Sequence, residues 1–255
     1  MKRSGNTLLI TGGTSGIGRA LAERFAALDN RVIVLGRRRA LLEEIAATTP
    51  GVFGYEVDVD DPRALADVAS RVLAEHPGLN VLINNAGIMR TEDLSRGRDL
   101  ADAEATITTN LLGPLRMTNA LVDHLAAQPD AAIVNVSSGL AFVPLVMAPT
   151  YSATKAAIHS YTVALREALR GRVEVIELAP PAVQTELTPG QSTRPGYQPL
   201  EAFIDEVMAL FAQAPTPPEI LVKGVHFLRF AEAENRFNDT LTALNEFARK
   251  AREAH

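Results

Sequence analysis

The chain has 255 residues, of which 47% are hydrophobic and 22% charged, a composition typical of a soluble globular domain with a sizeable core. Its formal net charge of -5 argues against non-specific binding to nucleic acid, and without cysteine it has neither disulfides nor thiolate chemistry. The first apolar run is too short for a secretory signal, and the longest one, residues 140–149, is too short to span a bilayer. We therefore expect a cytoplasmic protein that does not bind membranes.

Strand-like and helix-like patterns alternate along the first two thirds of the chain. Short apolar runs predict strands at residues 7–11, 31–35, 52–57, 80–83, 132–136 and 173–178. Helical spacing and capping signals predict helices at about residues 17–28, 38–48, 61–75, 100–127 and from Tyr151 to near Arg170. This alternation predicts an α/β fold: a Rossmann-like doubly wound parallel sheet with helices on both faces.

The alternation stops after Leu178. Residues 188–199 contain prolines, glycines and hydroxyl residues without an apolar period, which indicates a loop. Helices are predicted at residues 200–211, 218–230 and 238–254. Because no linker to a second domain is visible, we expect residues 1–255 to form one domain, with a mobile lid over the substrate around residues 186–215.

A glycine-rich turn follows the first predicted strand. Gly12, Gly16 and Gly18 stand in the order G-x-x-x-G-x-G: the first allows a tight turn, the second lets the backbone approach a pyrophosphate, and the third lets the next helix pack closely. That helix directs unpaired N–H groups at the phosphate, and Thr14 and Ser15 can add hydroxyl hydrogen bonds. A strand before the turn and a helix after it are the context that dinucleotide binding requires.

Three arginines at residues 37–39 follow the second strand, where an enzyme that selects NAD usually has an acidic residue. They lie at the start of a helix, whose dipole disfavours cations, so they indicate a nearby anion such as the 2′-phosphate of NADP. We predict Arg37 as the main phosphate ligand and Arg38 as the second. Asp58 follows the third strand and is equally well placed to accept from the adenine amino group or to begin a turn.

Tyr151 and Lys155 are four residues apart on a predicted helix and therefore share one face. A nearby ammonium favours the phenolate, so we predict that Lys155 lowers the pKa of Tyr151 well below the ~10 of free tyrosine. Such a pair can exchange a proton with a substrate oxygen near neutral pH. The spacing alone is common on helix surfaces, but the surrounding motifs favour a catalytic function.

With these motifs in this order, the chain resembles the short-chain dehydrogenase/reductase family in its single-domain form. The resemblance covers about residues 8–185. Residues 11–18 match the glycine motif of the family, and residues 84–87, Asn-Asn-Ala-Gly, match its sheet-stabilising motif. The catalytic tetrad of the family is matched by Asn110, Ser138, Tyr151 and Lys155.

The resemblance implies a role for each tetrad residue. Tyr151 would donate a proton to a carbonyl oxygen, Ser138 would orient that oxygen, and Lys155 would lower the tyrosine pKa and hold the nicotinamide ribose. Asn110 would hold a water that connects Lys155 to solvent. The resemblance also implies an NADP(H) site made of Gly12, Thr14, Ser15, Gly16, Ile17, Gly18, Arg37, Arg38, Asp58, Val59, Asn85, Ala86, Gly87, Tyr151, Lys155, Pro181, Val183 and Thr185.

Two features depart from the family pattern. The family usually has Pro-Gly-x-Val-x-Thr after the sixth strand, whereas residues 180–185 read Pro-Pro-Ala-Val-Gln-Thr, so Pro181 fixes φ and removes an N–H where glycine is usual. This variant looks like the DltE-type subgroup. The usual seventh strand is not evident after Val222, so its presence is doubtful.

These observations predict an NADPH-dependent oxidoreductase that interconverts an alcohol and a ketone or aldehyde. The carbonyl compound should have hydrophobic bulk, because several of the following apolar residues should line its pocket: Ile88, Met89, Leu140, Phe142, Val143, Leu145, Val146 and Met147. One alternative is a non-catalytic NADP-binding sensor, against which the intact tetrad argues. Another is an enzyme acting on imines or C=C bonds, which suits the serine–tyrosine pair less well.

The remaining expectations concern assembly and metals. Helices around residues 111–125 and 158–169 have apolar faces on both sides and pair across two-fold axes in the family, so a homodimer or homotetramer is expected. His159 lies one turn beyond Lys155, and we assign it to packing or an oligomer interface. No metal-ligand spacing is present, so no metal is expected.

Overall fold

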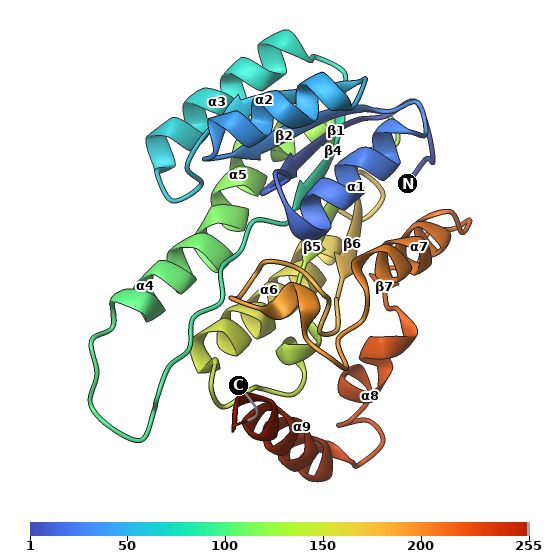
Figure 1. The fold of residues 1–255 in the computed structure, drawn as a ribbon. Coiled ribbons are helices and arrows are strands. Elements are labelled where there is room, and N and C mark those ends of the chain that lie inside the picture. The colour runs from blue at the N-terminus through green and yellow to red at the C-terminus, as the bar shows by residue number, and fades with distance from the viewer. Residues whose placement is uncertain (254–255) are drawn as a thin grey trace.

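Parallel strands form a single sheet in the computed structural model, which describes the backbone of residues 1–253 and the side chains of residues 1–250 (Figure 1). The seven described strands are β1 (Thr7–Thr11), β2 (Arg31–Gly36), β3 (Val52–Glu56), β4 (Leu79–Asn84), β5 (Ala132–Val136), β6 (Glu174–Leu178) and β7 (Glu219–Ile220). Their order across the sheet is β3-β2-β1-β4-β5-β6-β7, and every neighbouring pair is parallel. The direction of winding reverses between β1 and β4, so the predicted doubly wound sheet is confirmed.

Helices cover both faces of this sheet (Figure 1). One core joins the strands to α1 (Gly16–Ala26), α2 (Arg39–Thr48) and α7 (Leu200–Phe211). The core on the opposite face joins them to α3 (Pro62–Glu75), α5 (Gly113–Ala126) and α6 (Pro149–Ala168). Successive strand residues supply opposite cores: Leu8 and Ile10 belong to the first core and Leu9 to the second. This two-sided burial explains why the strands read as continuous apolar runs.

The segment after α7 differs from the prediction. Residues 218–230 do not form one helix: they form β7, a 3-10 turn η4 (Lys223–Val225) and the short α8 (His226–Arg229). The doubted seventh strand is present, because Ile220 pairs with Leu178 at the edge of the sheet and the Pro218 carbonyl accepts from the Glu177 N–H at 3.0 Å. In β7, backbone groups that would bond within a helix bond to β6 instead. The local periodicity of the sequence does not reveal such pairing with a distant strand.

The long helix predicted at residues 100–127 is interrupted. It consists of α4 (Ala101–Ile107), a π turn η1 (Thr108–Leu112) and α5. Single π turns inside α-helices often occur at functional sites, and this one contains the buried Asn110.

The end of the chain forms α9 (Phe237–Glu253), as predicted, although Ala254 of the predicted range lies outside the described residues. Leu241 and Leu244 of α9 pack with Leu228 of α8 and Val143, so these two helices lie together beside the start of α6 (Figure 1). Within the described part of the chain, no helix is both long and apolar enough to cross a bilayer.

Candidate active site

The glycine-rich loop runs between β1 and α1 and has no room for a side chain at Gly12 or Gly18. A Cβ on Gly12 would lie 2.8 Å from the Ala86 Cα, and one on Gly18 would lie 2.5 Å from the Gly12 carbonyl oxygen. The Asn85 amide group donates to the Thr11 and Gly12 carbonyl oxygens at 3.0 and 3.1 Å, which ties the loop to the end of β4. These two segments therefore meet at one edge of the sheet.

The start of α1 offers an anion site. Ser15 occupies the N-cap position, but its side chain makes no capping hydrogen bond, so the first N–H groups of the helix are not capped by it. Thr185 lies opposite, since a Cβ on Gly16 would be 3.4 Å from its Cβ. Bare backbone, an uncapped helix start and a threonine across the gap form a cradle that fits the pyrophosphate of a dinucleotide.

Arg37 and Arg38, which follow β2, contact different partners. Arg38 donates to the Thr14 hydroxyl at 3.0 Å and to the Ser15 hydroxyl at 2.7 Å, which holds its guanidinium against the phosphate loop. Arg37 is exposed and lies 3.6 Å from the Asp58 carboxylate. The predicted residues are thus brought together, and Arg38 makes the closer contact with the loop.

The remaining predicted cofactor residues occupy the same edge of the sheet. Ile17 is partly buried against the first core, and Val59 packs near Gly113 at the start of α5. Val183 is buried, and its carbonyl accepts from the Gln191 side chain at 2.8 Å. Pro181 lines the cavity described below.

The predicted catalytic side chains converge where β5 ends and α6 begins. Tyr151 and Ser138 are each only 7% exposed, and Lys155 is 4% exposed. The Lys155 ammonium donates to the Val136 carbonyl oxygen at 2.8 Å and lies 5.6 Å from the centroid of the Tyr151 ring. Because Ser138 follows β5 directly and the other two share one face of α6, a strand end and a helix start build this group.

Burial changes the acid–base properties of this group in a way that the sequence analysis did not foresee. Burial raises the pKa of Tyr151 to about 12, although its contact with Ser138 acts in the opposite direction. Burial also lowers the pKa of Lys155 to about 8. The predicted depression of the Tyr151 pKa is therefore wrong, because burial disfavours the charged phenolate more than the contact with Ser138 favours it.

Asn110 is fixed by the backbone of residue 88. Its carbonyl oxygen accepts from the Ile88 N–H and its amide donates to the Ile88 carbonyl, both at 2.8 Å. A Cβ on Gly87 would lie 3.4 Å from the Asn110 side-chain oxygen and 3.8 Å from the Lys155 nitrogen. The π turn therefore places Asn110 beside Lys155, with glycine leaving space between them. The water-holding role of Asn110 stays a prediction.

The tyrosine and the serine open into a cavity of about 440 Å³, a volume within the usual range for small-molecule sites. Four of the predicted wall residues line it, namely Met89, Leu140, Leu145 and Met147. The other four do not: Val143 packs against Leu228, Val146 is 62% exposed, Phe142 contacts His159, and the backbone of Ile88 binds Asn110.

The predicted lid divides into two parts. Loop residues, from Leu187 through Gln198, line the cavity, whereas α7 turns an apolar face into the core. The movement of this loop stays a prediction.

Another part of the wall was missed by sequence reasoning. It comes from α8 and α9, which contribute Phe227, Leu228, Leu244, Phe247 and Ala248. The apolar period of the last helix was visible in the sequence and could have indicated a buried face, but it could not tell which surface that face covers.

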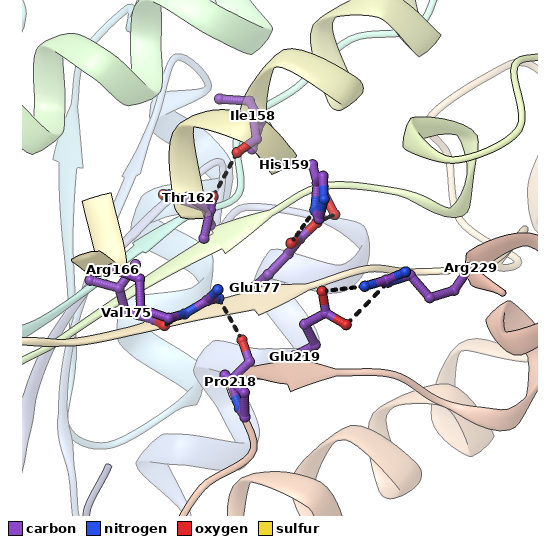
Figure 2. A network of polar contacts seen from close by, with 11 residues as sticks. Ile158, His159, Thr162, Arg166, Val175, Glu177, Pro218, Glu219 and Arg229 are labelled. Carbon is purple, nitrogen blue, oxygen red and sulfur yellow. Dashed lines mark hydrogen bonds and ion pairs between the residues drawn. The ribbon is translucent and has the colours of Figure 1, made fainter. Parts of the chain in front are cut away.

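His159 of α6 belongs to a polar network with residues of β6 and β7 (Figure 2). Its Nδ1 lies 2.7 Å from one oxygen of the fully buried Glu177 carboxylate, and Ser137 donates to the other oxygen at 2.5 Å. Arg229 donates to both oxygens of Glu219, at 3.0 and 3.1 Å. Ligand-type atoms of His159, Glu177 and Glu219 lie within 4.8 Å of one another, but each carboxylate oxygen already has a protein partner. The prediction that His159 serves packing is thus supported.

Comparisons with known proteins agree with this architecture. Residues 6–195 match the family model described as short chain dehydrogenase. The chain is 45% identical over 190 residues to "Uncharacterized oxidoreductase DltE" of Bacillus subtilis, which covers 73% of this chain and 75% of the relative. It is 34% identical over 191 residues to "NADP-dependent 3-hydroxy acid dehydrogenase" of Schizosaccharomyces pombe, covering 72% and 74% of the two chains.

A solved structure is similar over nearly the whole length. It is a short chain dehydrogenase from Burkholderia cenocepacia in complex with NADP, with a TM-score of 0.81 at 27% identity, covering 96% of this chain and 99% of that one. The sheet order, the glycine loop and the buried tyrosine–lysine pair agree with the family match, and the chain belongs to the short-chain dehydrogenase/reductase family of oxidoreductases.

Proposed function

We propose that the protein is an NADPH-dependent oxidoreductase that interconverts an alcohol and a ketone or aldehyde with hydrophobic bulk. The observation that carries this proposal is the buried Tyr151–Ser138–Lys155 group at the wall of a largely apolar cavity. A proton donor there faces a largely apolar space that can admit an apolar molecule.

The choice of NADP(H) rests on the arginines after β2. Arg37 and Arg38 stand where an NAD-selective site usually has a carboxylate, and Arg38 contacts the loop that cradles the pyrophosphate. A guanidinium can bind a phosphate through two hydrogen bonds. The NADP complex of the structural neighbour and the name of the fission-yeast relative also support this choice.

The chain's own residues would supply the proton and the orientation. NADPH, when bound, supplies the hydride that adds to the carbonyl carbon. Ser138 would hold the carbonyl oxygen, and Tyr151 would give that oxygen its proton, leaving an alcohol. Because burial keeps the pKa of Tyr151 near 12, the phenol stays protonated and available as an acid at neutral pH.

Lys155 would support this transfer. At neutral pH it is charged, since its pKa is about 8, and its charge would stabilise the phenolate that forms as the proton leaves. Asn110, held beside it by the backbone of residue 88, would hold the water that connects Lys155 to solvent. The reverse reaction would use the phenolate as the base.

The alternative class is a sensor that binds NADP(H) without turnover. A screen of aliphatic and aromatic ketones and aldehydes with NADPH, followed by absorbance of the reduced cofactor, separates the two. Turnover that depends on Tyr151 supports the enzyme. Tight NADPH binding with no turnover of any carbonyl compound would reject the enzymatic proposal and favour the sensor.

A further inference from the structure

The cavity beside Tyr151 is lined by a charged side chain that a neutral substrate would not pair with. Among its described lining residues, only Arg194 carries a charge; the others are apolar, small or uncharged polar residues. The guanidinium contacts neutral groups, the Tyr197 hydroxyl and the Pro189 carbonyl oxygen, both at 3.3 Å. Within the part of the chain whose side chains are described, it forms no ion pair with a carboxylate. A half-buried cation without an acidic partner costs desolvation free energy that an anionic ligand would recover.

Contacts within its own loop orient the Arg194 side chain. Its guanidinium lies 5.3 Å from the centroid of the Tyr197 ring, a cation–π contact. The neighbouring Gly196 has φ of 81°, and a Cβ there would lie 3.2 Å from the Phe247 ring of α9. Glycine therefore lets the loop that carries Arg194 lie directly against the last helix.

The residues that line the cavity differ in their exposed fractions. Tyr151 and Ser138 are each 7% exposed and form its floor, whereas Leu187, Phe227 and Phe247 are 37–50% exposed and form an apolar rim. Arg194 belongs to the same loop segment as Leu187 of this rim and is itself only partly buried. A ligand whose carbonyl reaches Tyr151 would lay an apolar chain along the walls and bring its far end to Arg194.

We propose that the substrate is an oxo acid or its hydroxy acid: a carbonyl or alcohol on an apolar chain that ends in a carboxylate, which Arg194 binds. This inference rests on the proposed function and names the substrate class for that same cavity. Arg194 is the residue that determines specificity, since it pairs with a part of the substrate that does not react.

The test uses three probes of each chain length: a straight-chain methyl ketone with a terminal carboxylate, its methyl ester, and the unsubstituted methyl ketone. kcat/KM is measured for the unmutated protein, Arg194→Gln, Arg194→Lys and the control Arg172→Gln. Arg172 is exposed just before β6, at the opposite end of the strands, and its replacement removes the same charge. The unmutated protein should prefer the acid to the ester, and more so at longer chain lengths.

In Arg194→Gln the acid-to-ester ratio of kcat/KM should fall roughly 10- to 150-fold, the loss of one charge-assisted hydrogen bond, and mainly through KM. Arg194→Lys should keep part of the preference, and Arg172→Gln should keep all of it. An ester used as well as the acid by the unmutated protein, or an acid-to-ester ratio that Arg194→Gln leaves unchanged, would overturn the inference.

Failure of the proposed function would give a different result from failure of the inference on Arg194. In that case no probe would oxidise NADPH, and calorimetric titration of the same acid and ester into the protein with NADP⁺ would still test the anion site. Acid binding that weakens in Arg194→Gln but not in Arg172→Gln supports the site without turnover. Equal affinity for acid and ester in this titration would overturn it.

Discussion

Glu177 of β6 and Glu219 of β7 are register partners, so two carboxylates lie side by side across adjacent strands, and each contacts a different nitrogen-bearing side chain (Figure 2). His159 contacts Glu177 at 2.7 Å, and Arg229 binds both oxygens of Glu219. Like charges directly opposite in a sheet are destabilising unless they are compensated. The network therefore permits β7 to pair with β6 and supports Ser137, the neighbour of Ser138.

Arg229→Met should destabilise the protein by about 1.5–3 kcal/mol, because it leaves Glu219 without its bidentate partner beside Glu177. Urea unfolding measures this change. Arg170→Met is the control, since Arg170 and Glu167 form an exposed pair that should contribute less than about 1 kcal/mol. The double variant Arg229→Met with Glu219→Gln should recover part of the loss; equal effects of the two single variants would show that the network does not stabilise the sheet edge.

The buried Lys155 should make stability depend on pH. Its pKa is lowered from 10.5 to about 8 by burial, so between these values the unfolded chain binds more protons than the folded one, and stability rises with pH. Relative to Lys155→Met, the unmutated protein should gain about 2–3 kcal/mol in free energy of unfolding between roughly pH 7 and pH 10. Parallel urea titrations at several pH values measure the difference.

The same variant should lose turnover and cofactor affinity, since Lys155 is assigned both to the proton donor and to the nicotinamide ribose. A difference in stability that does not change with pH would contradict the buried, cationic state of Lys155.

Tyr151→Phe keeps the ring and its packing but removes the proton donor. Turnover should fall ~100- to 10,000-fold, while NADP⁺ affinity by calorimetry should persist because the phosphate loop and Arg38 are unchanged. In the unmutated protein, alcohol oxidation should speed up with rising pH and show no plateau near neutrality, because the base is the phenolate of a tyrosine whose pKa burial raises to about 12.

Tyr161→Phe, on the same helix, serves as the control that removes a phenol elsewhere and should retain turnover. Single-turnover hydride transfer at a near-normal rate in Tyr151→Phe would exclude this tyrosine as the acid.

NADPH should be used more efficiently than NADH. Arg37→Asp and Arg38→Asp should each lower the NADPH-to-NADH ratio of kcat/KM, by roughly 10- to 150-fold for the residue that binds the 2′-phosphate. Arg39→Asp is the matched control, since Arg39 pairs with Glu43 on the exposed face of α2. The sequence predicts Arg37 as the stronger ligand of the 2′-phosphate. The contacts of Arg38 with Thr14 and Ser15 make Arg38 the alternative ligand. An unmutated protein that uses both cofactors equally well would refute the assignment.

A dimer or tetramer should form through the helices that retain exposed apolar side chains. Ile107 is 40% exposed beside η1, and Val163 is 47% exposed on α6. Light scattering at micromolar concentration should report twice or four times the 27.4 kDa chain mass. Val163→Glu should lower the measured mass. Leu94→Glu changes an exposed apolar residue outside these helices and should leave the mass unchanged. A monomeric unmutated protein would contradict this prediction.

Much of the site could be predicted from the sequence because its motifs are local. Gly12, Gly16 and Gly18 lie between one strand and the helix that follows it, so a short stretch of sequence sets their backbone geometry. Tyr151 and Lys155 share a helical face whatever surrounds the helix. The carboxyl ends of neighbouring parallel strands must lie at one edge of the sheet, and this places Asn85 against Gly12.

Only the tertiary structure decided the features that depend on distant partners. β7 exists because β6 offers an unpaired edge to two residues that have no strand pattern of their own. Phe247 lines the cavity because the chain returns across it some hundred residues after Tyr151. The raised pKa of Tyr151 has the same origin: the sequence supplies a cation one turn away, but burial by segments remote in sequence sets the cost of charging the phenol. Periodicity and spacing record which groups a short segment can present, whereas pairing, burial and desolvation depend on what the rest of the chain places around them.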